Sequence, residues 1–63
     1  MQQVEYRVIY LSTIGSYLII GISHSDLDSA IAFGNDDKDA RFVYEITFGE
    51  NPEIKQVHKF NQK

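Results

Sequence analysis

The sequence has no cysteine and only one proline among its 63 residues. Without cysteine the chain can form neither a disulfide nor a thiolate metal site, and these are common supports of very small domains. The chain also has no basic segment followed by an apolar core at its start, and no run approaches the ~18 apolar residues of a spanning helix. These absences lead us to expect a cytoplasmic protein without a membrane partner.

Positively charged residues are also scarce. Six Lys and Arg stand against nine Asp and Glu, which gives a formal net charge of −3 at pH 7. Direct nucleic-acid binding depends on clustered basic residues that contact phosphates, so we do not expect it. A chain of this length forms one domain, residues 1–63, and buries only about 60% of the surface that its unfolded form exposes. This shortage of buried surface favours a homodimer.

Alternating apolar residues predict a hairpin in the first third of the chain. The run "VEYRVIYL" alternates as a strand does, and "YLIIGI" is rich in β-branched and aromatic residues. A glycine-containing loop at residues 12–16 joins the two runs. The expected cross-strand pairs are Leu11 with Tyr17 and Ile9 with Ile19. Both pairs would lie on one face of the sheet.

A second hairpin is predicted near the end of the chain. The run "ARFVYEITF" has the clearest alternation, and "GENPE" after it supplies turn residues. The next run, "IKQVHKF", is either a strand or, because "NP" can begin a helix, a short helix. We favour the strand. We expect a register that pairs Phe48 with Ile54, in which the even-numbered residues of 42–48 face the helix that is predicted between the hairpins.

One short helix is predicted between the hairpins, within "HSDLDSAIAFG". Ser25 and Asp28 have the spacing of a capping box, and Gly34 or Asn35 can end the helix in the left-handed conformation. Two turns of helix are not stable alone, so this helix must lie on the sheet. The sequence therefore predicts an α+β fold: a two-layer β-β-α-β-β domain with a four-stranded, antiparallel-rich sheet and one short helix on one face.

The sheet face away from this helix is predicted to carry an apolar block on the first hairpin. Its members are Ile9, Leu11, Tyr17 and Ile19, with Ile14 at the adjoining loop tip, whereas Leu18 and Ile20 are assigned to the helix side. Large apolar residues gathered on a face that should meet water commonly mark interfaces. We therefore predict a small non-enzymatic protein-interaction module, of the inhibitor or adaptor type known from phages and mobile elements. It would bind a protein partner, or itself as a homodimer.

The acidic loop "NDDKD" supports an alternative function. Helix initiation does not explain Asp36, Asp37 and Asp39, and such a cluster can imitate nucleic-acid phosphates and bind a basic groove on another protein. We do not expect the loop to hold a metal, because no reading frame supplies both the glycine and the glutamate of an EF-hand calcium loop.

A small enzyme or enzyme fragment is the third alternative. His24 and His58 lie in different predicted elements, and neither has a ligand or catalytic partner at a suitable spacing. The sequence contains no nucleophile elbow, phosphate loop or dinucleotide motif. We expect no catalytic residue and no cofactor.

Overall fold

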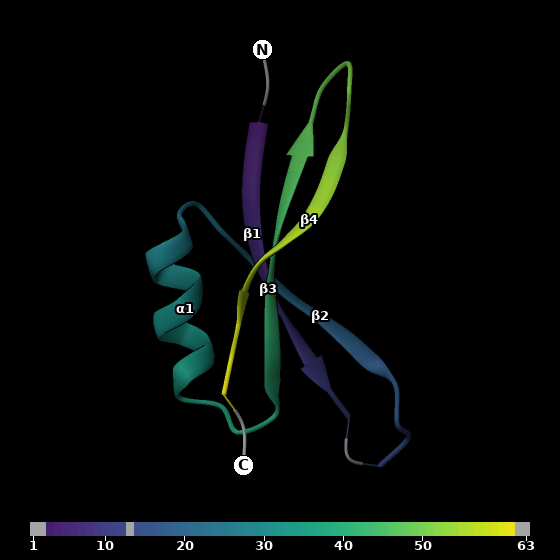
Figure 1. The fold of residues 1–63 in the computed structure, drawn as a ribbon, viewed down its shortest axis with the longest axis vertical. Helices are drawn as coiled ribbons and strands as arrows, with labels where there is room; N and C mark the ends of the chain where they lie inside the picture. Colours follow the sequence, from purple (N-terminus) through teal and green to yellow (C-terminus); the bar gives the residue numbers. More distant parts are fainter. Residues whose placement is uncertain (1–2, 13, 62–63) are drawn as a thin grey trace.

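The structure is a computed structural model that describes residues 3–12 and 14–61. Its elements, in chain order, are β1 (Gln3–Leu11), β2 (Leu18–His24), α1 (Leu27–Asn35), β3 (Ala40–Phe48) and β4 (Glu53–Lys59). All four strands belong to one antiparallel sheet with the order β2-β1-β3-β4 (Figure 1). The predicted β-β-α-β-β fold is confirmed, and so is the choice of a strand over a helix for the last element.

One face of this sheet is covered by α1. The helix packs mainly against β1 and β3, the two central strands, and Figure 1 shows it on one side of the sheet. On the opposite face the described residues form no further element. Within the described ranges, no helix has the length and apolar character needed to cross a membrane.

The helix begins one residue later than the predicted capping box. Asp26 is the N-cap, and its carboxylate accepts hydrogen bonds from the backbone nitrogen of Ser29 at 3.0 Å and from its Oγ at 2.9 Å. The predicted Ser25 cap is wrong, because the carboxylate of Asp26 satisfies both groups of Ser29 at once. These hydrogen bonds, the backbone one above all, lower the pKa of the Asp26 carboxyl.

The helix ends without a left-handed residue. Asp36 follows Asn35 in the right-handed conformation, with a φ of −85°, and neither Gly34 nor Asn35 has a positive φ. The predicted left-handed cap at these positions is therefore wrong. Gly34 is needed for close packing instead, since a Cβ at this position would lie 2.3 Å from Cζ of Phe60.

The first hairpin has a longer loop than the sequence predicts. The observed pairs are Leu11 with Leu18, Tyr10 with Ile19 and Ile9 with Ile20. Tyr17 belongs to the loop, where its backbone oxygen accepts a hydrogen bond from Ser12 N at 2.8 Å. The predicted register is wrong by one residue, and such a slip moves every side chain of a strand to the other face.

The strand β3 presents the face opposite to the predicted one. Val43 pairs with Val8, and both side chains are fully buried in the core under α1. The even-numbered side chains of 42–48 consequently point away from α1, so the prediction that they face the helix is wrong. In the second hairpin, Ile54 pairs with Ile46 rather than Phe48.

Each pair of neighbouring strands contains one irregularity in its register. The shifts lie between Arg7 and Ile9 in β1–β2, between Ile9 and Tyr10 in β1–β3, and between Val43 and Tyr44 in β3–β4. An extra residue in one strand bends that strand and puts its alternation out of step with its partner. The face assignments of the two ends of a strand therefore do not follow from simple alternation.

The core under α1 is made of few and mostly small side chains. Its buried members are Val8, Ala30, Ala40, Val43 and Phe60. Among fully buried side chains the largest are the two valines. Many of the larger aliphatic and aromatic side chains of the strands consequently lie outside this core.

Candidate protein-interaction surface

The sheet face opposite α1, here called the open face, carries large apolar side chains from all four strands. Its apolar members are Ile9, Leu11, Leu18, Ile20, Phe42, Tyr44, Ile46, Phe48 and Ile54. Cross-strand pairing with Ile9 and alternation along each strand put them there. Ile20 and Ile54, on the two edge strands, are 64% and 66% exposed.

A groove of about 270 Å³ crosses the open face. It is lined by Ile9, Leu18, Ile20, Tyr44, Ile46 and Ile54. Ile9, on the central strand β1, is only 4% exposed, whereas Ile20 and Ile54 stand largely free on either side. The lining is aliphatic apart from Tyr44, as in the desolvated centre of a protein–protein interface.

Two charged residues of the open face neutralise each other beside the groove: Arg7 pairs with Tyr44 and Glu5 with Ile46. The guanidinium of Arg7 donates from Nε to the carboxylate of Glu5 and from Nη1 to the backbone oxygen of Gly21 at 2.7 Å. Ser23 Oγ donates to the other oxygen of Glu5 at 3.0 Å. The hydrogen bond from Arg7, with that from Ser23, lowers the pKa of Glu5. The carboxylate therefore stays ionised and paired with Arg7.

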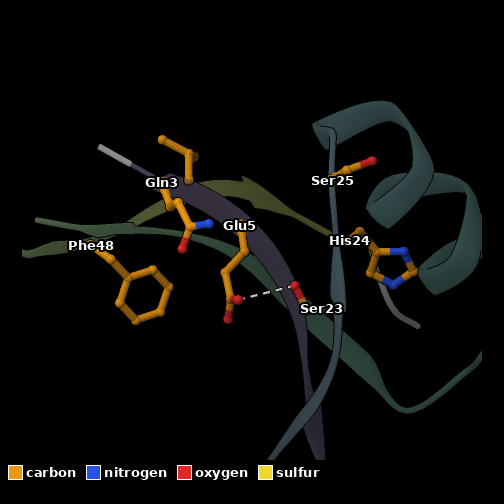
Figure 2. A pocket seen from close by; sticks show the side chains of 7 residues that line it. Gln3, Glu5, Ser23, His24, Ser25 and Phe48 are labelled. Atoms are coloured by element: carbon orange, nitrogen blue, oxygen red, sulfur yellow. Dashed lines mark hydrogen bonds between the residues drawn. The ribbon is translucent and has the colours of Figure 1, made fainter. Parts of the chain in front are cut away.

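A polar hollow of about 500 Å³ lies beside this ion pair (Figure 2). It is lined by Gln3, Val4, Glu5, Ser23, His24, Ser25 and Phe48. Ser23 donates to Glu5, whereas the His24 ring turns towards α1, where its centroid lies 5.0 Å from the ring centroid of Phe33. Nε2 of His24 is buried and has no hydrogen-bond partner among the described residues. The Ser23 hydroxyl is thus joined to a carboxylate whose pKa the hydrogen bond from Arg7 lowers, and this makes Glu5 a weak base.

The five predicted interface residues are distributed over different parts of the first hairpin. Ile9 and Leu11 lie on the open face, although Ile9 is covered by its neighbours. Ile19 pairs with Tyr10 of the helix-side face, so the expectation that Ile19 shares a face with Ile9 and Leu11 is wrong. Tyr17 and Ile14 belong to the loop before β2, and Ile14 is 96% exposed.

Sequence reasoning placed most residues of the groove in the core. The misplaced residues are Leu18, Ile20, Tyr44, Ile46 and Ile54. One signal in the sequence could have identified them. Both parities of residues 18–22 are apolar, as are parts of both parities in β1, and one nine-residue helix covers only one face of a four-stranded sheet.

The three residues of the predicted acidic surface lie in the connection between α1 and β3. The backbone nitrogen of Asp36 donates to the oxygen of Gly34 at the end of the helix. Oδ1 of Asp37 accepts from the backbone nitrogen of Asp39 at 2.9 Å, and the backbone oxygen of Asp39 accepts from Leu11 N at 2.9 Å. These contacts shape the turn into β3. Among the described residues, no group of three or more His, Asp or Glu could hold a metal ion.

Comparisons of the chain with models of protein families, with curated proteins and with solved structures found no match. The geometry and chemistry of the open face are therefore the basis for a functional assignment.

Proposed function

We propose that the protein is a cytoplasmic, non-enzymatic interaction module, of the small inhibitor or adaptor type, whose binding surface is the open face. The observation that carries this proposal is the apolar groove across all four strands, on the face that α1 leaves uncovered. A sheet with an apolar face is stable when another layer covers that face. Large exposed apolar areas on a small protein commonly mark a site of association.

The exposure of the apolar side chains supports the same proposal. Under the helix, Val8, Ala40 and Val43 are buried and the larger tyrosines are partly buried, while isoleucine, leucine and aromatic side chains occupy the open face. Ile20 and Ile54 remain about two-thirds exposed. Covering them with a partner would remove this exposed apolar surface from water, and each Å² so buried contributes about 25 cal/mol.

A small-molecule site fits the groove less well. Ligand pockets normally combine an apolar lining with a few convergent polar groups that fix the ligand's orientation. Here the lining offers only the Tyr44 hydroxyl, and both edge strands leave the groove open at its sides. A protein surface, which supplies a broad apolar contact rather than a defined small shape, suits this lining better.

The nucleic-acid-mimic alternative has less support. The carboxylate of Asp37 accepts a hydrogen bond within its own loop, and Asp36 directly follows the helix end. The Asp37 carboxylate therefore helps to shape the turn into β3, which gives part of the acidic cluster a structural role.

A matched pair of substitutions tests the proposal. Ile20 and Ile22 are the same residue type on the same strand and are 64% and 62% exposed. Ile20 is on the open face, but the register irregularity in β1–β2 puts Ser23 on that face as well. Ile22, the neighbour of Ser23, therefore lies on the opposite face. We expect Ile20→Glu to abolish the capture of protein, whether a different protein or an untagged copy, by tagged bait in native lysate. Ile22→Glu should leave capture intact, since it adds the same charge outside the open face.

The bait proteins must first show equal far-UV circular dichroism and cooperative melting. Capture that is equally strong with folded Ile20→Glu would contradict the proposal, because a buried carboxylate without a partner is strongly unfavourable in an apolar interface.

A further inference from the structure

We propose that the partner which covers the open face is a second copy of this chain, packed sheet against sheet around a two-fold axis. This inference rests on the proposed function of the open face and identifies its partner. Aligned sheets pack face to face about 10 Å apart, with the side chains of the two inner faces interdigitated. The groove would then become the centre of a dimer core.

The distribution of charge favours self-association. In a two-fold interface each surface meets its own copy, so a face with a large charge of one sign would repel itself. Among the described residues, the charged side chains of the open face are Glu5, Arg7 and Lys59. Glu5 and Arg7 form an ion pair within the chain, and Lys59 lies at the end of edge strand β4. The ion pair lies on the central strand β1, where Arg7 pairs with Tyr44 and Glu5 with Ile46, and its two charges cancel. The open face therefore has no large charge of one sign.

The acidic surplus of the chain lies elsewhere. The chain has a formal net charge of −3, and several carboxylates lie in or next to α1. These residues are Asp26, Asp28, Asp36, Asp37 and Asp39. In a sheet-to-sheet dimer both copies of α1 lie on the outside, so these like charges are far apart and keep the dimer in solution.

The area of the open face is sufficient for a weak but specific dimer. Four strands at the usual spacing are about 19 Å wide, and nine residues of strand extend about 30 Å. One face therefore covers roughly 600 Å², and two copies would bury roughly 1,200 Å² in total, the lower limit of specific interfaces. We consequently expect a dimer whose population depends on concentration.

Pairing through the edge of β2 is the competing mode of self-association. This strand is uncharged over "LIIGIS", and none of the described strands pairs with its outer side, a condition that favours pairing with another strand. Ile20→Glu alone cannot distinguish the two modes, because Ile20 belongs to β2. A substitution on the far edge, β4, distinguishes them.

Gln56 provides this substitution. It pairs with Tyr44, so it lies on the open face, and it is already exposed and polar. Gln56→Glu adds a charge to the open face while it leaves every apolar contact of the fold in place. Lys55→Gln is the matched control, because Lys55 is the neighbouring residue on the helix-side face, paired with Glu45.

The experiment is sedimentation velocity on the pure protein from about 1 to 500 μM, which brackets micromolar affinity. We expect wild type, Ile22→Glu and Lys55→Gln to change from the 7.3 kDa monomer to twice that mass with rising concentration. Ile20→Glu should stay monomeric, and Gln56→Glu should dimerise about tenfold more weakly because each copy would bring a carboxylate into the apolar interface.

Two results would overturn the inference in distinguishable ways. If wild type stays monomeric throughout while its capture of another protein is lost in Ile20→Glu, the second copy is the wrong partner and the proposed function stands. If a dimer forms but Gln56→Glu has wild-type affinity, the dimer uses the β2 edge. If neither self-association nor capture responds to Ile20→Glu, the open face is not a binding surface and both proposals are wrong.

Discussion

The two faces of the sheet differ in what they carry and in what covers them. The covered face presents Val8, Ala40 and Val43 to α1, and these side chains are almost completely buried. The open face presents larger groups, of which Ile20 and Ile54 are two-thirds exposed. In most small α+β domains the more apolar face is the one under the helix. Here large apolar side chains also lie on the face that α1 leaves uncovered, and this is the basis of the proposal that the open face binds a partner.

The largest difference between the faces is expected in the stability of the monomer. Val43→Ala removes buried methyl groups from the covered face and should lower the free energy of unfolding by about 2 kcal/mol. Ile54→Ala removes a larger group, but from an exposed position, and should cost less than about 0.5 kcal/mol. Urea denaturation of dilute protein measures both values.

When association is measured instead of stability, the variant with the larger effect should be Ile54→Ala. Ile54→Ala should weaken dimer formation and capture, while folded Val43→Ala should retain both. If Ile54→Ala destabilises the dilute monomer as much as Val43→Ala does, Ile54 belongs to the core of the monomer and the distinction between the two faces fails.

The sequence predicts the elements of the fold well and their faces poorly. Alternation identifies β1 and β3, and the apolar stripe with Asp26 and Asp28 identifies α1. The direction in which β3 faces depends on the pairing of Val43 with Val8, residues 35 positions apart, which no local pattern contains. The tyrosine in the loop before β2 lengthens that loop by one residue, and this exchanges the faces of Leu18 and Ile19.

The sequence also predicts the wrong residues for the apolar interface, for the same reason. Reasoning from the sequence indicated an apolar interface on the sheet, but it assigned Ile20, Ile46 and Ile54 to the core. The three register irregularities each shift the alternation by one residue, and their positions follow from long-range strand pairing rather than from composition.

A smaller effect is expected at the start of α1, on the covered side only. The hydrogen bonds from Ser29 lower the pKa of Asp26 below its ordinary value of 3.8, so the folded state prefers the ionised carboxylate. The resulting stabilisation is complete above the unfolded-state pKa, near pH 4, and is lost as the pH falls through the lower folded-state pKa. Asp26→Ala should lower the melting temperature at pH 7 by roughly 5 °C.

Asp26→Asn keeps an oxygen that can accept from Ser29 but does not titrate, so it serves as the control. Between about pH 5 and pH 2, the range in which carboxyl groups ordinarily titrate, the melting temperature of Asp26→Asn should fall less than that of wild type. Thermal melts across this range check the difference. Neither Asp26 variant should change dimerisation at pH 7, because α1 lies away from the open face; a loss of dimer in folded Asp26→Ala would show that the helix takes part in the interface.

The absence of cysteine from the chain permits the most direct measurement of the central claim, that the open face is covered on association. Single-cysteine variants Ile20→Cys and Ile22→Cys report on opposite faces of one strand through the rate at which a thiol reagent modifies them. We predict equal rates in dilute protein, and a rate at Ile20→Cys that falls as concentration rises while Ile22→Cys does not change. Equal rates at all concentrations, in protein that sedimentation shows to be dimeric, would contradict the claim.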